Sequence, residues 1–126
     1  MKILVVKTNE TVKAVQILAK KDNEITFADL RKLVSSNSEM LYTPRISRLA
    51  YLYVMFVDKD SKVPQFNKLA TLLTGDSSRP VMGDAVLIRT NHLGSGAKMF
   101  ALENDEAAGL VERMSKLLGK KLEMTT

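Results

Sequence analysis

Arginine and aromatic residues alternate in one segment of the sequence, a pattern that could hold a nucleotide or a single strand. Arg45 and Arg48 are followed by Tyr51 and Tyr53. On surfaces that bind single-stranded nucleic acids, bases stack on aromatic rings and phosphates pair with arginine. The same tyrosines lie in the most apolar run of the chain. Core packing, with their hydroxyls at the margin of a sheet, is therefore the alternative, and we favour it.

Asn67 and Thr71 are four residues apart, a spacing that places two side chains on one side of a helix. On that side, away from Phe66 and Leu69, the pair could hydrogen-bond an amide or the edge of a nucleobase. The alternative is structural: the asparagine caps the helix, and the threonine hydroxyl bonds to the backbone. We favour the structural interpretation and keep both residues as candidates for ligand binding.

A glycine-rich segment at residues 94–96 could present backbone N–H groups to a phosphate, with Arg89 or Lys98 as the counter-charge. It lacks the spacing and the lysine of a P-loop, so a plain hairpin loop is the favoured alternative. The predicted ligand-binding residues are arginines and hydrogen-bonding side chains: Arg45, Arg48, Asn67, Thr71 and Arg89.

The sequence offers no recognisable catalytic, metal-binding or cofactor-binding set. Cysteine is absent and His92 is the sole histidine, so neither a Cys–His pair nor a multi-histidine metal site can form. Asp58 and Asp60 resemble the start of a calcium loop, but Val63 and Leu69 occupy the positions of its glycine and glutamate. We therefore predict a protein that is not an enzyme and that holds no metal or cofactor.

Composition indicates one soluble intracellular domain. The chain has 126 residues, of which 45% are hydrophobic, enough for a single core. The lack of cysteine suits a reducing compartment, and neither a secretory signal nor a membrane-spanning run is recognisable. We expect no membrane partner.

The charge balance modestly favours anionic partners. Nineteen Lys and Arg against fourteen Asp and Glu give a net charge of +5. Most of these charges are scattered, as on an ordinary soluble surface. Only Arg113, Lys116, Lys120 and Lys121 bunch together, and there they also suit the negative end of a helix dipole.

The first third of the sequence predicts a β-hairpin followed by a helix. The β-rich runs Lys2–Lys7 and Val12–Leu18 are separated by four polar residues, which is typical of a hairpin. Thr26 and Asp29 mark a helix start, and apolar residues recur behind them at helical spacing through Val34. This pattern predicts a capped amphipathic helix of about three turns.

The middle of the sequence predicts a buried strand and a short helix. The continuous apolar run Leu49–Val57 is typical of a strand covered on both faces, and we place it at the centre of the sheet. A short strand at Glu39–Thr43 precedes it. The helix that follows begins after an N-cap at Asn67 and ends at Gly75.

The last third predicts two strands and a long helix. The strands are Ala85–Ile88 and Lys98–Ala101. The helix begins at a cap on Asn104 and ends at Gly119, and we expect residues 119–126 to be a frayed tail. The predicted order is β-β-α-β-β-α-β-β-α. This predicts the α+β class: a single compact domain over residues 1–126, with a mixed or antiparallel sheet of about five to six strands and three helices.

One stretch of the sequence resembles a family of small uncharacterised domains from bacteriophages and large DNA viruses. The stretch is VDKDSKVPQFNKLATLLTG followed by MGDAVLIR, after an MKILVV opening. That family pairs an acidic turn and a proline with an Asn-x-x-Ala-Thr helix start and a Gly-Asp strand. Here these features are Asp58, Pro64, Asn67, Ala70, Thr71, Gly83 and Asp84.

The resemblance covers nearly all of the chain, and its motifs are short and structural in character. It implies a viral or phage accessory protein and brings no catalytic residue with it. Lys59 and Lys62 depart from the family's more acidic or glycine-containing turn, so no acidic site is carried over. It also implies a location in the host cytoplasm, or in the nucleus if the host is eukaryotic.

These observations lead to three functional hypotheses. The first is a non-enzymatic accessory protein that binds a host protein or a small anionic ligand, such as a nucleotide signal sequestered from host defence. The second is a nucleic-acid-binding protein of viral replication or packaging, whose affinity would fall as salt rises. The third is a structural or assembly protein that forms a homo-oligomer through its apolar strand or last helix.

Overall fold

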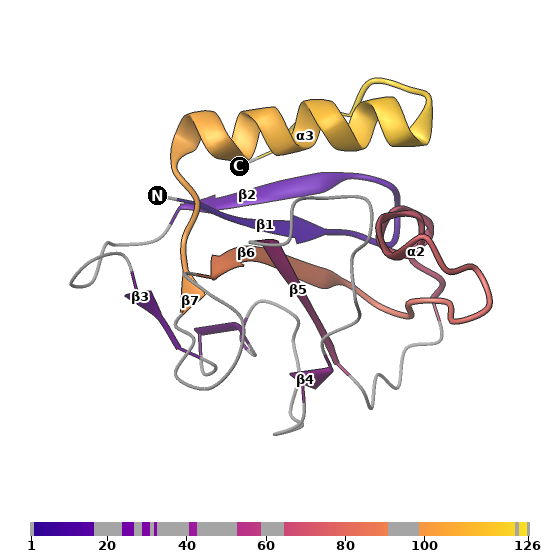
Figure 1. Ribbon diagram of the computed structural model, residues 1–126, viewed down its shortest axis with the longest axis horizontal. Helices are drawn as coiled ribbons and strands as arrows, with labels where there is room; N and C mark the ends of the chain where they lie inside the picture. The colour runs from indigo at the N-terminus through magenta and orange to yellow at the C-terminus, as the bar shows by residue number, and fades with distance from the viewer. Residues whose placement is uncertain are drawn as a thin grey trace.

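The computed structural model shows a mixed β-sheet with, in the described part of the chain, two helices (Figure 1). It describes residues 2–16, 24–26, 29–30, 32, 41–42, 53–58, 65–90, 99–122 and 124–125. The elements in chain order are β1 (Lys2–Val6), β2 (Val12–Gln16), β3 (Glu24–Ile25), β4 (Leu41–Tyr42), β5 (Tyr53–Asp58), α2 (Lys68–Thr74), β6 (Ala85–Thr90), β7 (Met99–Phe100), α3 (Asn104–Leu118) and β8 (Met124–Thr125).

Strand β6 is the centre of the sheet. It pairs with β5 along one edge and with β1 and then β7 along the other, always antiparallel. The hydrogen-bonded path runs β3-β7-β6-β1-β2-β8, and β5 and β4 pair beside it. Strand β8 lies parallel to β2, which makes the sheet mixed, one of the two predicted alternatives. The predicted opening hairpin is confirmed as the antiparallel pair β1 and β2.

Alternate residues of the central strands pack into two core layers, one on each face of the sheet. On β6, Leu87 joins the layer that contains Met114 of α3, whereas Val86 and Ile88 join the opposite layer. Helix α3 therefore covers one face of the sheet (Figure 1). Met55 and Phe56 of β5 divide in the same way, so the prediction of a strand covered on both faces is confirmed.

Helix α2 is bounded by the residues that the sequence predicts. Asn67 is its N-cap, and its side-chain oxygen accepts a hydrogen bond from the Ala70 N–H at 3.0 Å. Gly75 closes the helix with φ 73°, in the left-handed region that glycine adopts without a steric penalty. Leu69 and Leu73 carry its apolar side into the core layer shared with α3.

The N-cap of helix α3 lies one residue earlier than predicted. The N-cap is Glu103, not Asn104, and Glu103 and Glu106 exchange the hydrogen bonds of a capping box. The helix ends at Gly119, as predicted. Neither α2 nor α3, the helices of the described residues, is long and apolar enough to cross a bilayer.

The prediction of three helices is wrong, because the described residues contain two, and the element order becomes β-β-β-β-β-α-β-β-α-β. Of the helix expected over residues 26–34, only Thr26, Asp29, Leu30 and Lys32 are described. Thr26 and Asp29 do exchange capping hydrogen bonds. Asp29, Leu30 and Lys32 have helical backbone, and the other residues of this stretch lie outside the described part of the chain.

Two further expectations are corrected by the pairing of strands. The strand at the centre is β6 and not the run Leu49–Val57, of which the structure describes residues 53–57 as part of β5. The expected frayed tail contains β8 and the buried Leu122. Strands of two residues, such as β8, are too short to show an alternating pattern in a sequence.

Candidate functional site

An open groove lies between the last turns of α3 and the chain that returns from it. It encloses about 490 Å³. Ala108, Val111 and Leu122 supply apolar surface, and Ser115 and Gly119 lie beside them. The remaining lining residues are charged: Glu112, Lys116, Lys120 and Lys121.

The groove exists because the chain turns back sharply after α3. Gly119 adopts φ 78°, and the N–H groups of Gly119 and Lys120 both donate to the Ser115 carbonyl, at 3.0 and 3.3 Å. This is the hydrogen-bond pattern with which glycine commonly ends a helix. The Ser115 hydroxyl then accepts a hydrogen bond from the Leu122 N–H at 2.9 Å, so the returning segment is held against the helix.

Three lysines give the groove a positive rim. Lys116 faces Glu112 across an exposed pair with a nitrogen–oxygen distance of 3.9 Å. Lys120 lies 3.5 Å from Glu10, a residue of the β1–β2 turn. Lys121 has no ion-pair partner among the described residues. Ammonium groups around an apolar floor suit a ligand with an apolar body and an anionic group.

A second polar cluster lies beneath the first turn of α3. The Tyr53 hydroxyl donates to Glu106 at 2.8 Å, and burial, followed by this hydrogen bond, raises the pKa of Tyr53 above its ordinary value. Arg89 is the cross-strand neighbour of Tyr53, and its guanidinium lies 5.9 Å from the centre of the Phe100 ring. The Arg89 Nε is buried and has no hydrogen-bond partner within the described structure.

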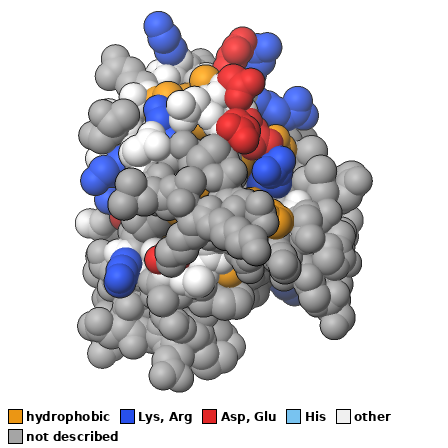
Figure 2. Space-filling view, turned by 90° about the vertical axis from the view of Figure 1, so that its left-hand side faces the viewer, with side chains coloured by type: hydrophobic (Ala, Val, Ile, Leu, Met, Phe, Trp, Pro, Cys, Tyr) orange, Lys and Arg blue, Asp and Glu red, His pale blue; other side chains and the backbone are white. Residues whose placement is uncertain are grey.

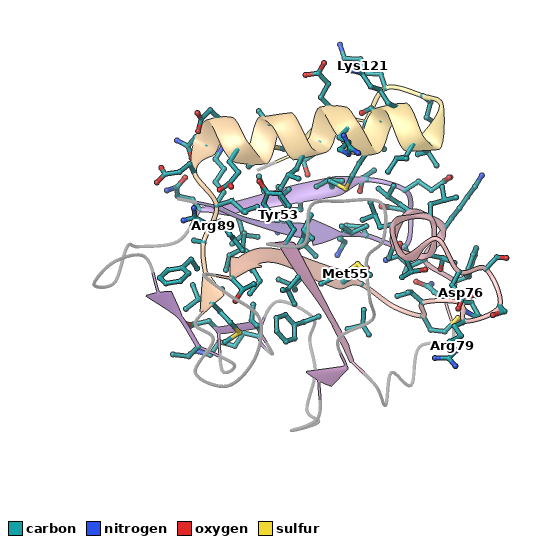
Figure 3. All side chains as sticks on the ribbon, in the orientation of Figure 1. Tyr53, Met55, Asp76, Arg79, Arg89 and Lys121 are labelled. Carbon is teal, nitrogen blue, oxygen red and sulfur yellow. The ribbon has the colours of Figure 1, made fainter. Side chains whose placement is uncertain are left out.

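The second cluster adjoins the acidic start of α3. Tyr53 and Arg89 lie together on the α3 side of the sheet (Figure 3). Three carboxylates already occupy the start of the helix, from Glu103, Asp105 and Glu106. Figure 2, which looks at the end of the molecule where α3 begins, shows acidic side chains gathered there. The negative charge of these carboxylates repels an anionic ligand, so the groove is the better candidate for binding one.

The structure does not bring the predicted ligand-binding residues together. Arg45 and Arg48 lie outside the described residues. Asn67 and Thr71 are buried in and next to α2, at the opposite end of the sheet from Arg89 (Figures 1 and 3). The Asn67 amide donates to the carbonyls of Val6 and Gly83.

Thr71 is likewise committed to the backbone of its own neighbourhood. Its hydroxyl donates to the Asn67 carbonyl at 2.8 Å and accepts from the Val81 N–H at 2.9 Å. Both side chains therefore make the contacts of the structural interpretation favoured above, in which the asparagine caps the helix and the threonine hydroxyl bonds to the backbone. Together they fix the start of α2 against β1 and the segment that leads into β6.

The lysines of the groove were recognised in the sequence as a basic cluster, but the groove itself was not predicted. Lys116, Lys120 and Lys121 stand out as a basic cluster, which the helix dipole alone explains. The missing part was the return of residues 119–122, which we expected to fray. The glycine after the helix, followed by the apolar Leu122, was the signal that the chain turns back and packs.

Comparison with protein-family models, curated proteins and solved structures finds no match for this chain. The resemblance to small viral domains therefore stays a prediction. Within the described residues, no group of three or more His, Cys, Asp or Glu side chains is placed to hold a metal ion.

Proposed function

We propose that this protein is a non-enzymatic binding protein that takes a small anionic ligand with an apolar part into the α3 groove. The observation that carries the proposal is the apolar floor of Ala108, Val111 and Leu122 beside the lysine rim. A volume of about 490 Å³ falls in the usual range for small-molecule sites. Binding there needs no catalytic group.

The charge distribution along α3 favours a small ligand over a nucleic-acid strand. Basic residues flank the end of the helix, whereas Asp105 and Glu106 occupy its first turn. Lys116 and Asp105 are eleven residues apart, or about 16 Å along the helix axis. A strand that continued along α3 would meet these carboxylates within a few nucleotides, whereas a compact anion would not.

A nucleotide matches the groove in chemistry, because its base can cover the apolar floor while its phosphate faces the lysines. The accessory role implied by the resemblance to viral domains would then be the sequestration of a nucleotide signal. A host protein that inserts an acidic, partly apolar segment is the alternative partner. The first test is therefore a panel of free linear and cyclic nucleotides, assayed by calorimetry.

The decisive comparison is between two double variants with the same change in net charge. Lys116→Gln with Lys121→Gln removes two rim lysines, whereas Lys13→Gln with Lys32→Gln removes two exposed lysines outside the groove. Exposed charges contribute up to about 1 kcal/mol each, so we expect roughly tenfold weaker nucleotide binding for the first variant and little change for the second. Failure of every nucleotide to bind, or equal losses in both variants, would contradict the proposal.

A further inference from the structure

Lys120, one of the three rim lysines, already faces a carboxylate of the protein. Glu10 Oε2 lies 3.5 Å from Lys120 Nζ, and Glu10 Oε1 lies 3.8 Å from Lys68 Nζ of α2. Glu10 therefore joins the turn between β1 and β2 to helix α2 and to the segment that follows α3. Its backbone has φ 65°, in the left-handed region that a non-glycine residue rarely adopts. The turn thus holds the Glu10 carboxylate beside the groove.

We infer that the groove takes a phosphate monoester, and that Glu10 is the internal carboxylate that competes with this phosphate for Lys120. The inference rests on the proposed function and names the ligand class of the same groove. Lysine rather than arginine forms the rim, and the three ammonium groups are separate point charges. A phosphate monoester offers three acceptor oxygens and nearly two negative charges to three point charges, whereas a carboxylate offers two oxygens and one negative charge.

The exchange is physically feasible because the pair to be broken is weak. The Glu10 side chain is 32% exposed and that of Lys120 is 54% exposed, so water screens their attraction. Glu10 keeps Lys68 as a partner when Lys120 turns to the ligand. A ligand carboxylate that replaced the Glu10 carboxylate at Lys120 would gain little binding free energy. A phosphate dianion would gain more, because Lys116 and Lys121 also attract its additional charge.

Two ligands that share one apolar ring system test the ligand class. Calorimetry at pH 7.5 with 1-naphthyl phosphate and 1-naphthoate compares a dianion with a monoanion. We expect the phosphate to bind at least about fivefold more tightly, and its affinity to fall as the pH drops below about 6, where the phosphate takes up a proton. Equal affinities, or a phosphate affinity that is the same at pH 5 and pH 7.5, would overturn the ligand class.

Two variants of equal charge test the competitor. Glu10→Gln and Asp105→Asn each remove one negative charge, but only Glu10 faces Lys120. We expect Glu10→Gln to tighten binding of 1-naphthyl phosphate by about threefold, and Asp105→Asn to change it less than about twofold. Glu10→Asn, which suits the left-handed turn, must reproduce the gain, and thermal unfolding shows that each variant is folded.

The outcomes separate the inference from the function on which it rests. If 1-naphthyl phosphate binds and neither Glu10 variant tightens it, Glu10 is not a competitor and the proposed function survives. If neither ligand binds the wild-type protein or the variants, the proposed function falls and the inference falls with it.

Discussion

At the scale of single residues, the side chain of Asn67 makes three hydrogen bonds to three parts of the described structure. It is fully buried, and its amide group donates to Val6 and Gly83 at 2.9 and 2.8 Å while its oxygen caps α2. Its role as N-cap could be predicted from the sequence, because the cap and the helix are adjacent. The bonds to Val6 and Gly83 could not, since these residues lie 61 and 16 positions away.

We expect Asn67→Ala to destabilise the protein by about 2–4 kcal/mol, because it removes a cap and leaves buried backbone groups without partners. Chemical denaturation gives this free energy directly. Asn9→Ala is the matched control: Asn9 is exposed and its side chain accepts within a local turn, so its loss should be below about 1 kcal/mol. Similar losses in the two variants would show that the buried contacts of Asn67 do not matter for stability.

At the scale of elements, one carboxylate ties α3 to the sheet. Glu106 Oε1 accepts the Glu103 N–H within the capping box, and Oε2 accepts the Tyr53 hydroxyl of β5. The helix itself could be predicted from its apolar spacing and from Gly119. Its first residue was misplaced because asparagine is the commoner cap, whereas glutamate is not among the preferred cap residues. The contact with Tyr53 depends on packing, which periodicity does not reveal.

This contact predicts a pH dependence. Because the pKa of Tyr53 is raised in the folded protein, the folded state holds the phenolic proton more tightly than the unfolded chain does. The contribution is therefore complete below the unfolded pKa of about 10 and is lost as the pH rises through the folded pKa. We expect Tyr53→Phe to lower stability by about 1 kcal/mol at pH 8 and by progressively less above pH 10.

Urea denaturation of the wild-type protein and Tyr53→Phe from pH 8 to pH 11 measures this difference, and comparing the two proteins cancels the titration of the lysines. Adding Glu106→Gln completes a double-mutant cycle that isolates the Tyr53–Glu106 pair. A difference that stays constant across this pH range would contradict the raised pKa.

At the scale of the whole molecule, residues 119–125 complete the face of the sheet that α3 covers. Leu122 belongs to the core layer of α3, and β8 extends the sheet beyond β2. The sheet class and the hairpin were predictable because their strands are long or adjacent in the sequence. Strands β4 and β7 lie within the predicted strands Glu39–Thr43 and Lys98–Ala101. Strands β3 and β8 were not predicted, because two residues carry no periodicity and their partners are distant in the sequence.

Deleting residues 120–126 should therefore destabilise the protein by about 2–4 kcal/mol, since it exposes the surface that Leu122 buries and removes β8. It should also abolish ligand binding, because one wall of the groove is lost. Leu122→Ala in the full chain is the companion variant, which removes the packing and keeps the strand pairing. A deletion variant as stable as the wild-type protein would contradict a structural role for this segment.

The pairing of β8 with β2 also has a consequence for the order in which the protein can fold during synthesis. Strand β2 is synthesised more than a hundred residues before residues 124–125, which supply its outer partner, and β1 is synthesised well before its partner β6. Such distant pairings give the chain a high contact order and slow its folding. The outer edge of the β1–β2 hairpin therefore stays unpaired until residues 124–125 have been made, which is the interval in which chaperones would protect it from aggregation.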